Sequence, residues 1–305
     1  MFPPTVIIGL HGILRRAPWF DRVVEALTAE DSAEEATAEE TSEETPEETP
    51  EETSVEEQVL SSLVIERAGA YGWQTVTSWL TENGQVTARH EPTAWAHEEV
   101  GGDWTPDGRI HQLAWLQAGV RTDPPPLGLP VRPITLVLAE ALARLGTVTF
   151  TGLHALLPLP AARRNTAFHQ AELAPWFALA DPDARHEVMV TVSCHPGKAA
   201  VSSDDAAAVC AAVRDMAQGA VELPRPGAHS APPVTSPAAP PGLDLDLDHA
   251  VHTQGMREAF RFGCTTREWS PDLAVWLVEM VADALRAAGR VAPVVVTASL
   301  PLPPA

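Results

Sequence analysis

The most regular pattern of apolar positions occurs twice along the chain. Residues 137–160 and residues 280–303 each read as an Ala/Leu-rich amphipathic helix, a glycine, an apolar strand and a Leu-Pro-Leu-Pro exit. Aligned without a gap at a spacing of 143 residues, they are identical at ten of 24 positions. The identical positions are Ala139, Ala141, Leu142, Gly146, Val148, Ala155, Leu157, Pro158, Leu159 and Pro160. One supersecondary unit used twice predicts two related α/β halves.

Outside the repeated unit, the pattern predicts strands and helices of ordinary length. The expected strands are residues 5–10 and 187–193. The expected helices are residues 110–118, 166–177, 204–218 and 255–262, and a long helix that begins at Ser270-Pro271. A serine cap followed by proline at the first helical position is a typical helix start.

Residues 58–90 have a β-prone composition. The short runs 63–66, 75–80 and 86–90 are rich in Val, Thr and Trp, and Asn83-Gly84 separates the last two. An Asn-Gly pair between β-prone runs favours a hairpin, because both central residues of a type I′ turn need positive φ. We therefore expect an antiparallel meander in the first half.

These elements predict a mixed α/β fold with α+β character, in which two pseudo-repeated helix–strand halves surround a mixed sheet or sheets. The first half comprises residues 1–29 and 58–160, and a disordered acidic linker, residues 30–57, interrupts it. The second half comprises residues 161–305, with a proline-rich excursion at residues 224–242.

The net charge of −21 is concentrated in the acidic linker. Residues 30–57 hold fourteen Asp or Glu and no Lys or Arg, so the other residues carry −7, the difference between −21 and −14. A mildly acidic folded part has no basic footprint of the kind that nucleic-acid binders show. The acidic run either captures a basic partner or, as we expect, only links two parts of the fold.

Cysteine usage and the N-terminus indicate the compartment. Cys194, Cys210 and Cys264 are odd in number and widely spaced, which argues against a disulfide framework. The basic residues Arg15 and Arg16 follow the first apolar run, the reverse of a signal peptide, and no apolar run is long enough to span a bilayer. We expect a cytoplasmic protein.

The opening residues 4–12, Pro-Thr-Val-Ile-Ile-Gly-Leu-His-Gly, resemble the first motif of the α/β-hydrolases. In that family an apolar strand ends in His-Gly, and the following loop helps to build the oxyanion hole. The resemblance implies a role for His11 near an active site. No Gly-x-Ser-x-Gly nucleophile elbow occurs in the chain, so what the resemblance implies is a degenerate hydrolase-like protein.

The loop of residues 193–198 is the main candidate site. It should follow a strand and precede a helix, where α/β folds often bind ligands. Cys194, His195 and His11 are the catalytic candidates, although no complete catalytic set is assigned. Gly197, Lys198 and Ser203 are the candidate ligand-binding residues, because helix N-terminal amides and a cation favour an anion. An ordinary surface turn explains the same residues.

For function, we expect a non-catalytic protein that binds another protein, with no cofactor, no nucleic acid and no membrane. Asp244, Asp246 and Asp248 lack the glycine and glutamate of a calcium loop, so no metal site is predicted. Nine tryptophans against one tyrosine fit partner binding. The alternative is an enzyme or an anion-binding protein that uses the 193–198 loop. It requires His11 or His154 within reach of Cys194, whereas the binding hypothesis requires an exposed apolar patch that carries tryptophan.

Overall fold

The structure is a computed structural model of the whole chain, and its main body can be described in detail. The described residues are 4–23, 25–26, 29, 55–70, 95–120, 128–162, 167–197, 201–203, 205–223, 242–245 and 253–301. Residues 30–54 of the acidic linker, the predicted strands 75–80 and 86–90, and most of the proline-rich excursion lie outside these residues.

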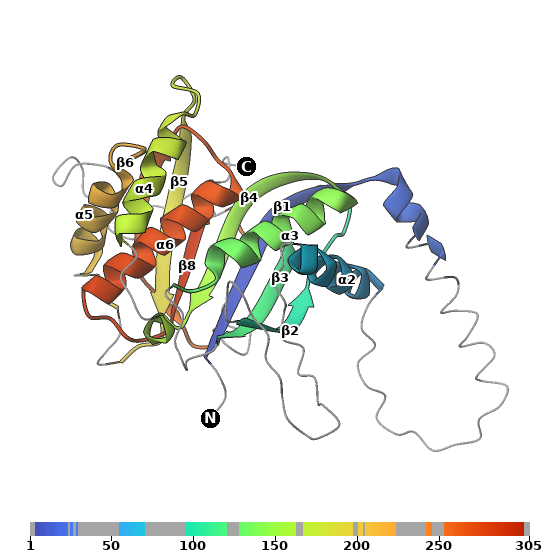
Figure 1. Cartoon of the computed structure of the whole chain (residues 1–305), viewed down its shortest axis with the longest axis horizontal. Coiled ribbons are helices and arrows are strands. Elements are labelled where there is room, and N and C mark those ends of the chain that lie inside the picture. Colours follow the sequence, from blue (N-terminus) through green and yellow to red (C-terminus); the bar gives the residue numbers. More distant parts are fainter. Residues whose placement is uncertain are drawn as a thin grey trace, which may run out of the picture.

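The fold is mixed α+β and is built on one eight-stranded antiparallel sheet (Figure 1). Its strand order is β2-β3-β1-β4-β8-β5-β7-β6, and every neighbouring pair is antiparallel. The strands are β1 (Thr5–Arg16), β2 (Trp95–Gly101), β3 (His111–Val120), β4 (Gly146–Leu157), β5 (His186–Cys194), β6 (Val221–Glu222), β7 (Arg257–Thr266) and β8 (Val294–Ser299). The strands β1–β4 and the strands β5–β8 thus share one sheet, joined where β4 pairs with β8.

The helices cover one face of this sheet, and α3 and α6 lie side by side over its centre (Figure 1). The helices are α2 (Val55–Ala70), α3 (Val131–Leu145), α4 (Ala167–Ala178), α5 (Asp205–Ala217) and α6 (Pro271–Ala287), with a short 3₁₀ turn at Leu159–Ala161. α6 begins as the sequence predicts: the Leu273 amide donates to the Ser270 side chain, and Pro271 is the first helical residue.

The core fills the space between the helices and the sheet. The residues that alternate toward the helices on β1 are Val6, Ile8 and Leu10, and those on β8 are Val294, Val296 and Ala298. Trp276 of α6 is fully buried and donates its indole N–H to the Gln170 carbonyl of α4. Its ring stacks on Phe177 with the ring centroids 4.5 Å apart. This packing ties α4 to α6 in the same layer.

Three predicted elements have the wrong type. Residues 63–66 belong to helix α2, which buries Leu60, Val64 and Ala68 at a spacing of four and starts inside the expected linker at Val55. Residues 110–118 and 255–262 were predicted as helices but lie mainly in strands β3 and β7. In β3 the alternation is carried by Ala114, Leu116 and Ala118, and alanine marks a buried strand position poorly.

The other face of the sheet carries a short covering segment, residues Gly242–Leu245. The Gly242 amide donates to the Leu300 carbonyl at 2.8 Å, and the Leu300 amide donates to the Thr151 carbonyl at 2.9 Å. Leu243 occupies the space that a side chain at Gly152 would need: a Cβ placed there would lie 2.4 Å from the Leu243 Cδ2. Glycine at position 152 therefore lets this segment lie directly on β4.

Candidate functional site

The predicted loop follows β5 as expected, but its cysteine is not available to a ligand. Cys194 is buried on the helix-covered face, and its Sγ donates to the Val201 carbonyl at 3.5 Å. His195 and Gly197 are exposed, and Lys198 lies outside the described residues. The loop places Cys194 in the core and His195 in solvent, so the two side chains do not act on one ligand.

The N-terminus of α5 already has a carboxylate. Asp205 accepts from the Ser202 amide at 2.8 Å and forms an ion pair with Arg290 at 2.7 Å. Desolvation opposes ionisation, yet the Ser202 amide and the Arg290 guanidinium lower the pKa of Asp205 overall. Ser203, a predicted ligand-binding residue, is exposed beside this pair. The charge that a bound anion would supply at this helix end therefore comes from Asp205.

His11 lies in the middle of a strand. β1 continues through His11 and Gly12 to Arg16 and pairs with β3 and β4, both antiparallel. The α/β-hydrolase sheet is built from mostly parallel strands. The implication that residues 4–12 form a strand ending in a hydrolase-type loop is therefore wrong.

The buried partner of His11 is His154 on the adjacent strand β4. The His11 Nε2 and the His154 Nδ1 lie 2.8 Å apart, and the side chains are 0% and 4% exposed. The ring of His154 lies over Gly9 of β1: a Cβ at position 9 would be 2.1 Å from the His154 Cε1. Gly9 thus provides the space in which the two imidazoles meet.

The hydrogen bonds of this pair fix the tautomer of each ring. The Asp244 amide of the covering segment donates to the His11 Nδ1 at 3.1 Å, so this nitrogen carries no proton. In the neutral ring the proton is then on Nε2, which donates to the His154 Nδ1. His154 in turn carries its proton on Nε2. The hydrogen bonds therefore form one chain, in which the covering segment donates to His11 and His11 donates to His154.

Burial keeps both imidazoles neutral. Desolvation, followed by repulsion from His154, lowers the pKa of His11 well below its usual value. Desolvation also lowers the pKa of His154, to about 4. The pair is uncharged at neutral pH, in agreement with the hydrogen-bond directions.

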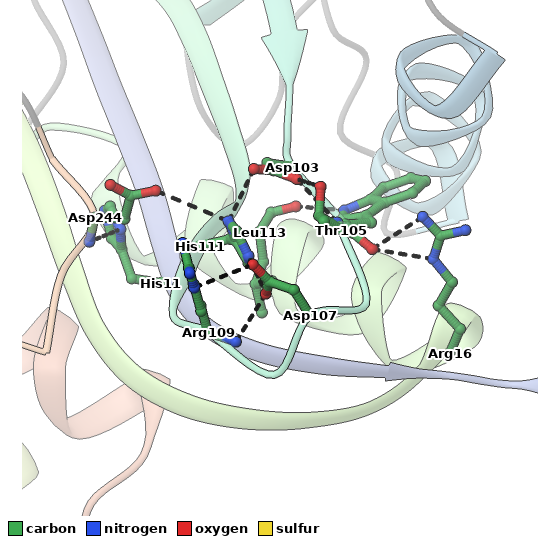
Figure 2. A network of polar contacts seen from close by, with 10 residues as sticks. His11, Arg16, Asp103, Thr105, Asp107, Arg109, His111, Leu113 and Asp244 are labelled. Carbon is green, nitrogen blue, oxygen red and sulfur yellow. Dashed lines mark hydrogen bonds and ion pairs between the residues drawn. The ribbon is translucent and has the colours of Figure 1, made fainter.

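A third histidine of the site, His111, has surroundings that favour its protonated form. Figure 2 shows His111, at the start of β3, among the carboxylates of Asp103, Asp107 and Asp244. Its Nδ1 lies 2.8 Å from Asp103 and 4.0 Å from Asp244, and its Nε2 lies 2.7 Å from Asp107. Partial desolvation opposes protonation, but the hydrogen bond to Asp107 and the three carboxylates raise the pKa of His111. Asp244 thus contacts His11 through its backbone and His111 through its side chain.

The loop that carries Asp103 and Asp107 is held by Trp104. The indole N–H of this buried side chain donates to the Leu113 carbonyl at 2.6 Å. The Arg16 guanidinium donates to the Trp104 carbonyl at 2.9 Å. Phe20 packs edge-on against the indole with the ring centroids 5.4 Å apart. The carboxylates around His111 are therefore supported by a packed loop.

The structure does not bring Cys194 together with the histidine pair. Strands β4 and β8 lie between β1 and β5, a separation of about 14 Å for three strand spacings. Among the residues that the structure describes, no three His, Cys, Asp or Glu side chains are grouped closely enough to hold a metal ion.

Sequence reasoning missed His111 and the role of Asp244, and it named His154 only as a possible partner of Cys194. The sequence separations explain this: 143 residues separate His11 from His154, and 233 separate His11 from Asp244. Gly9 and Gly152 are the local signals, since a glycine inside a strand often marks a close approach by another group.

Comparison with models of known protein families, with curated proteins and with solved structures finds no match for this chain.

The neutral histidines make folding stability depend on pH. Because their pKa values are lower in the folded protein than in the unfolded chain, the unfolded chain binds more protons below about pH 6.5. We expect the free energy of unfolding to fall from about pH 6.5 toward pH 4, by up to about 1.4 kcal/mol per pH unit for each histidine. Urea unfolding of the wild type and of His154→Gln measures this slope, which should be shallower in the variant. The control His195→Gln removes an exposed histidine and should keep the wild-type slope. Equal slopes in all three proteins would contradict the assignment.

Gly9 should not tolerate a side chain. In Gly9→Ala the new methyl group collides with the His154 ring, and we expect a loss of about 2 kcal/mol in the free energy of unfolding. The matched control is Gly69→Ala in α2, where a Cβ meets nothing within 4 Å and the change should be neutral or stabilising. Denaturant unfolding compares the two variants, and an unaltered Gly9→Ala protein would show that the ring does not occupy this place.

Proposed function

We propose that this protein acts by binding another protein, on a scaffold made of two related halves. The partner contact is assigned to the end of α4, where apolar side chains face solvent. The elements β1-α2-β2-β3-α3-β4 and β5-α5-β6-β7-α6-β8 follow the same β-α-β-β-α-β order, which is known as the split β-α-β or ferredoxin-like arrangement.

The pairing of β4 with β8 supports the relation between the halves. His154 lies directly opposite Thr297, and these residues are 143 positions apart, the spacing of the repeated passages. Pairs on either side depart symmetrically from this point, for example Ala155 with Val296 and Leu153 with Ala298. If a twofold axis relates two copies that pair through equivalent strands, the residue at the axis must pair with the equivalent residue of the other copy.

The strands that flank the central pair, β1 beside β4 and β5 beside β8, support the same relation without sequence identity. Ile8 of β1 pairs with Ala155, and Val190 of β5 pairs with Ala298, the equivalent alanine of the second passage. The pairing of β1 with β3 shifts by one residue after Leu10, which lies two residues after Ile8. The pairing of β5 with β7 shifts by one residue after Val192, which lies two residues after Val190. Both halves therefore share a bulge position as well as a strand order.

The observation that carries the binding function is the apolar surface at the end of α4. Trp176 is 62% exposed and Leu179 is 80% exposed, and the Leu179 amide donates to the Trp176 carbonyl within one turn. The neighbouring Phe177 faces inward against Trp276, so the end of α4 that carries Trp176 is held in place by packing. Large exposed aromatic side chains on a fixed backbone are typical anchors of protein interfaces.

The chemistry around this surface describes the partner. Glu172, Asp181 and Asp183 are exposed beside the apolar side chains, and the chain as a whole is acidic. An apolar centre with a charged rim is the usual arrangement of an interface. The partner should present an apolar pocket for Trp176 flanked by Lys or Arg, and opposite charges would speed its association.

A cytoplasmic location belongs to the same proposal. Cys194, Cys210 and Cys264 are all free thiols, which suits a reducing compartment. None of the helices in the described part of the chain is both long and apolar enough to cross a membrane.

The double variant Trp176→Ala/Leu179→Ser tests the binding surface. Both side chains are exposed, so the fold should persist while a partner captured from cells by the wild type is lost. The matched control is Val291→Ser, which changes another exposed apolar side chain, 55% exposed. The captured partner is then purified. Calorimetry should show a dissociation constant at least about tenfold higher for the double variant than for the wild type, as expected for an aromatic anchor. Equal affinity of all three proteins would refute this surface.

A further inference from the structure

The covering segment Gly242–Leu245 is held on the sheet by one hydrogen bond to a backbone group, one to a titratable side chain, and the ion pair of Asp244 with His111 at 4.0 Å. The Gly242 amide donates to the Leu300 carbonyl, and this contact does not change with pH. The Asp244 amide donates to the imidazole nitrogen Nδ1 of His11. The second contact exists only while this nitrogen is free to accept.

We propose that His11 and His154 form a pH-sensitive latch that holds the covering segment on the sheet while both rings are neutral and releases it when the pair gains a proton. The two rings are buried and in direct contact, so they respond as one unit.

The geometry makes the response independent of which ring takes the proton. A proton added to His11 occupies its Nδ1, which then faces the Asp244 amide as a second donor. A proton added to His154 occupies the Nδ1 that faces His11. His11 can then accept at Nε2 only by moving its own proton to Nδ1, again opposite the Asp244 amide. In each case the amide loses its acceptor.

The groups around the pair influence the pH at which the latch responds. His154 faces His11 from β4, and the covering segment contributes the Asp244 carboxylate. His111 lies near on β3, 4.0 Å from that carboxylate. On β8 the neighbours across the ladder are Thr297 and Ser299, which are uncharged. The pKa values of Asp103 and Asp107 are lowered, so their contacts with His111 persist in mild acid while the latch opens.

Release would change the surface of the sheet. Leu243 lies against Gly152, and Leu245 packs on the small apolar cluster of Leu156, Met256 and Val295. Detachment at Asp244 would let Leu243 and Leu245 leave these contacts. The latch therefore couples proton uptake by two buried imidazoles to exposure of an apolar strip on β4 and β8.

Hydrogen exchange of the Asp244 amide, followed by NMR between pH 7.5 and pH 3.5 and corrected for the intrinsic pH dependence, tests the latch. In the wild type we expect the protection of this amide to fall at least tenfold as the pair takes up a proton, while amides of β4 and β8 stay protected. In His11→Gln the side chain at position 11 cannot titrate, so the fall should be absent. In the control His111→Gln the fall should remain, since His11 and His154 are untouched.

A wild-type amide with constant protection would overturn the proposal, as would an equal fall in His11→Gln or the loss of the fall in His111→Gln. If His11→Gln does not fold, the nitrogen-15 spectrum of the wild-type imidazoles decides the matter. The latch requires a neutral His11 with its proton on Nε2 at pH 7, and the opposite tautomer excludes it.

Discussion

The backbone pairing of β4 with β8 is the contact on which the rest of the molecule depends. It runs from Gly152–Ser299 to Leu157–Val294 at the centre of the sheet and joins two four-stranded groups into one surface. Without it each group would expose a long central edge, which proteins normally cover or shorten. The pairing also places α3 beside α6 and creates the common core around Trp276.

The same pairing explains why the histidine pair is buried. His154 lies on β4 between β1 and β8, so a strand flanks it on each side. Its side chain can be reached only from the face of the sheet opposite the helices. Glycine at position 9 then gives the ring space over β1, and glycine at position 152 lets the covering segment approach. Two imidazoles are thereby removed from water and remain neutral, while the carboxylates around His111, a short distance away, raise the pKa of that residue.

The sequence predicted the fold best where its signals are strong and local. The helix–strand pairs α3-β4 and α6-β8, the strand of residues 187–193 and the start of α6 at Ser270-Pro271 all appear as expected. The prediction failed for β3 and β7, where alanine, glycine and charged residues obscure the strand alternation, and for residues 63–66, where tertiary packing favours a helix over β-prone side chains. An eight-stranded antiparallel order could not be predicted, because it depends on pairings between distant segments. The candidate site was only partly predictable for the same reason: His11 was identified, whereas its contacts with His154 and Asp244 form only after β1, β4 and the covering segment come together.

The most direct test of the shared sheet is the register of β4 against β8, measured by cross-strand nuclear Overhauser effects in the full-length protein. We expect backbone contacts that place His154 opposite Thr297, with Leu153 opposite Ala298 and Ala155 opposite Val296. A register displaced by even one residue, or no contact between the two strands, would contradict the joining of the two four-stranded groups into one sheet and the burial of His154 that follows from it.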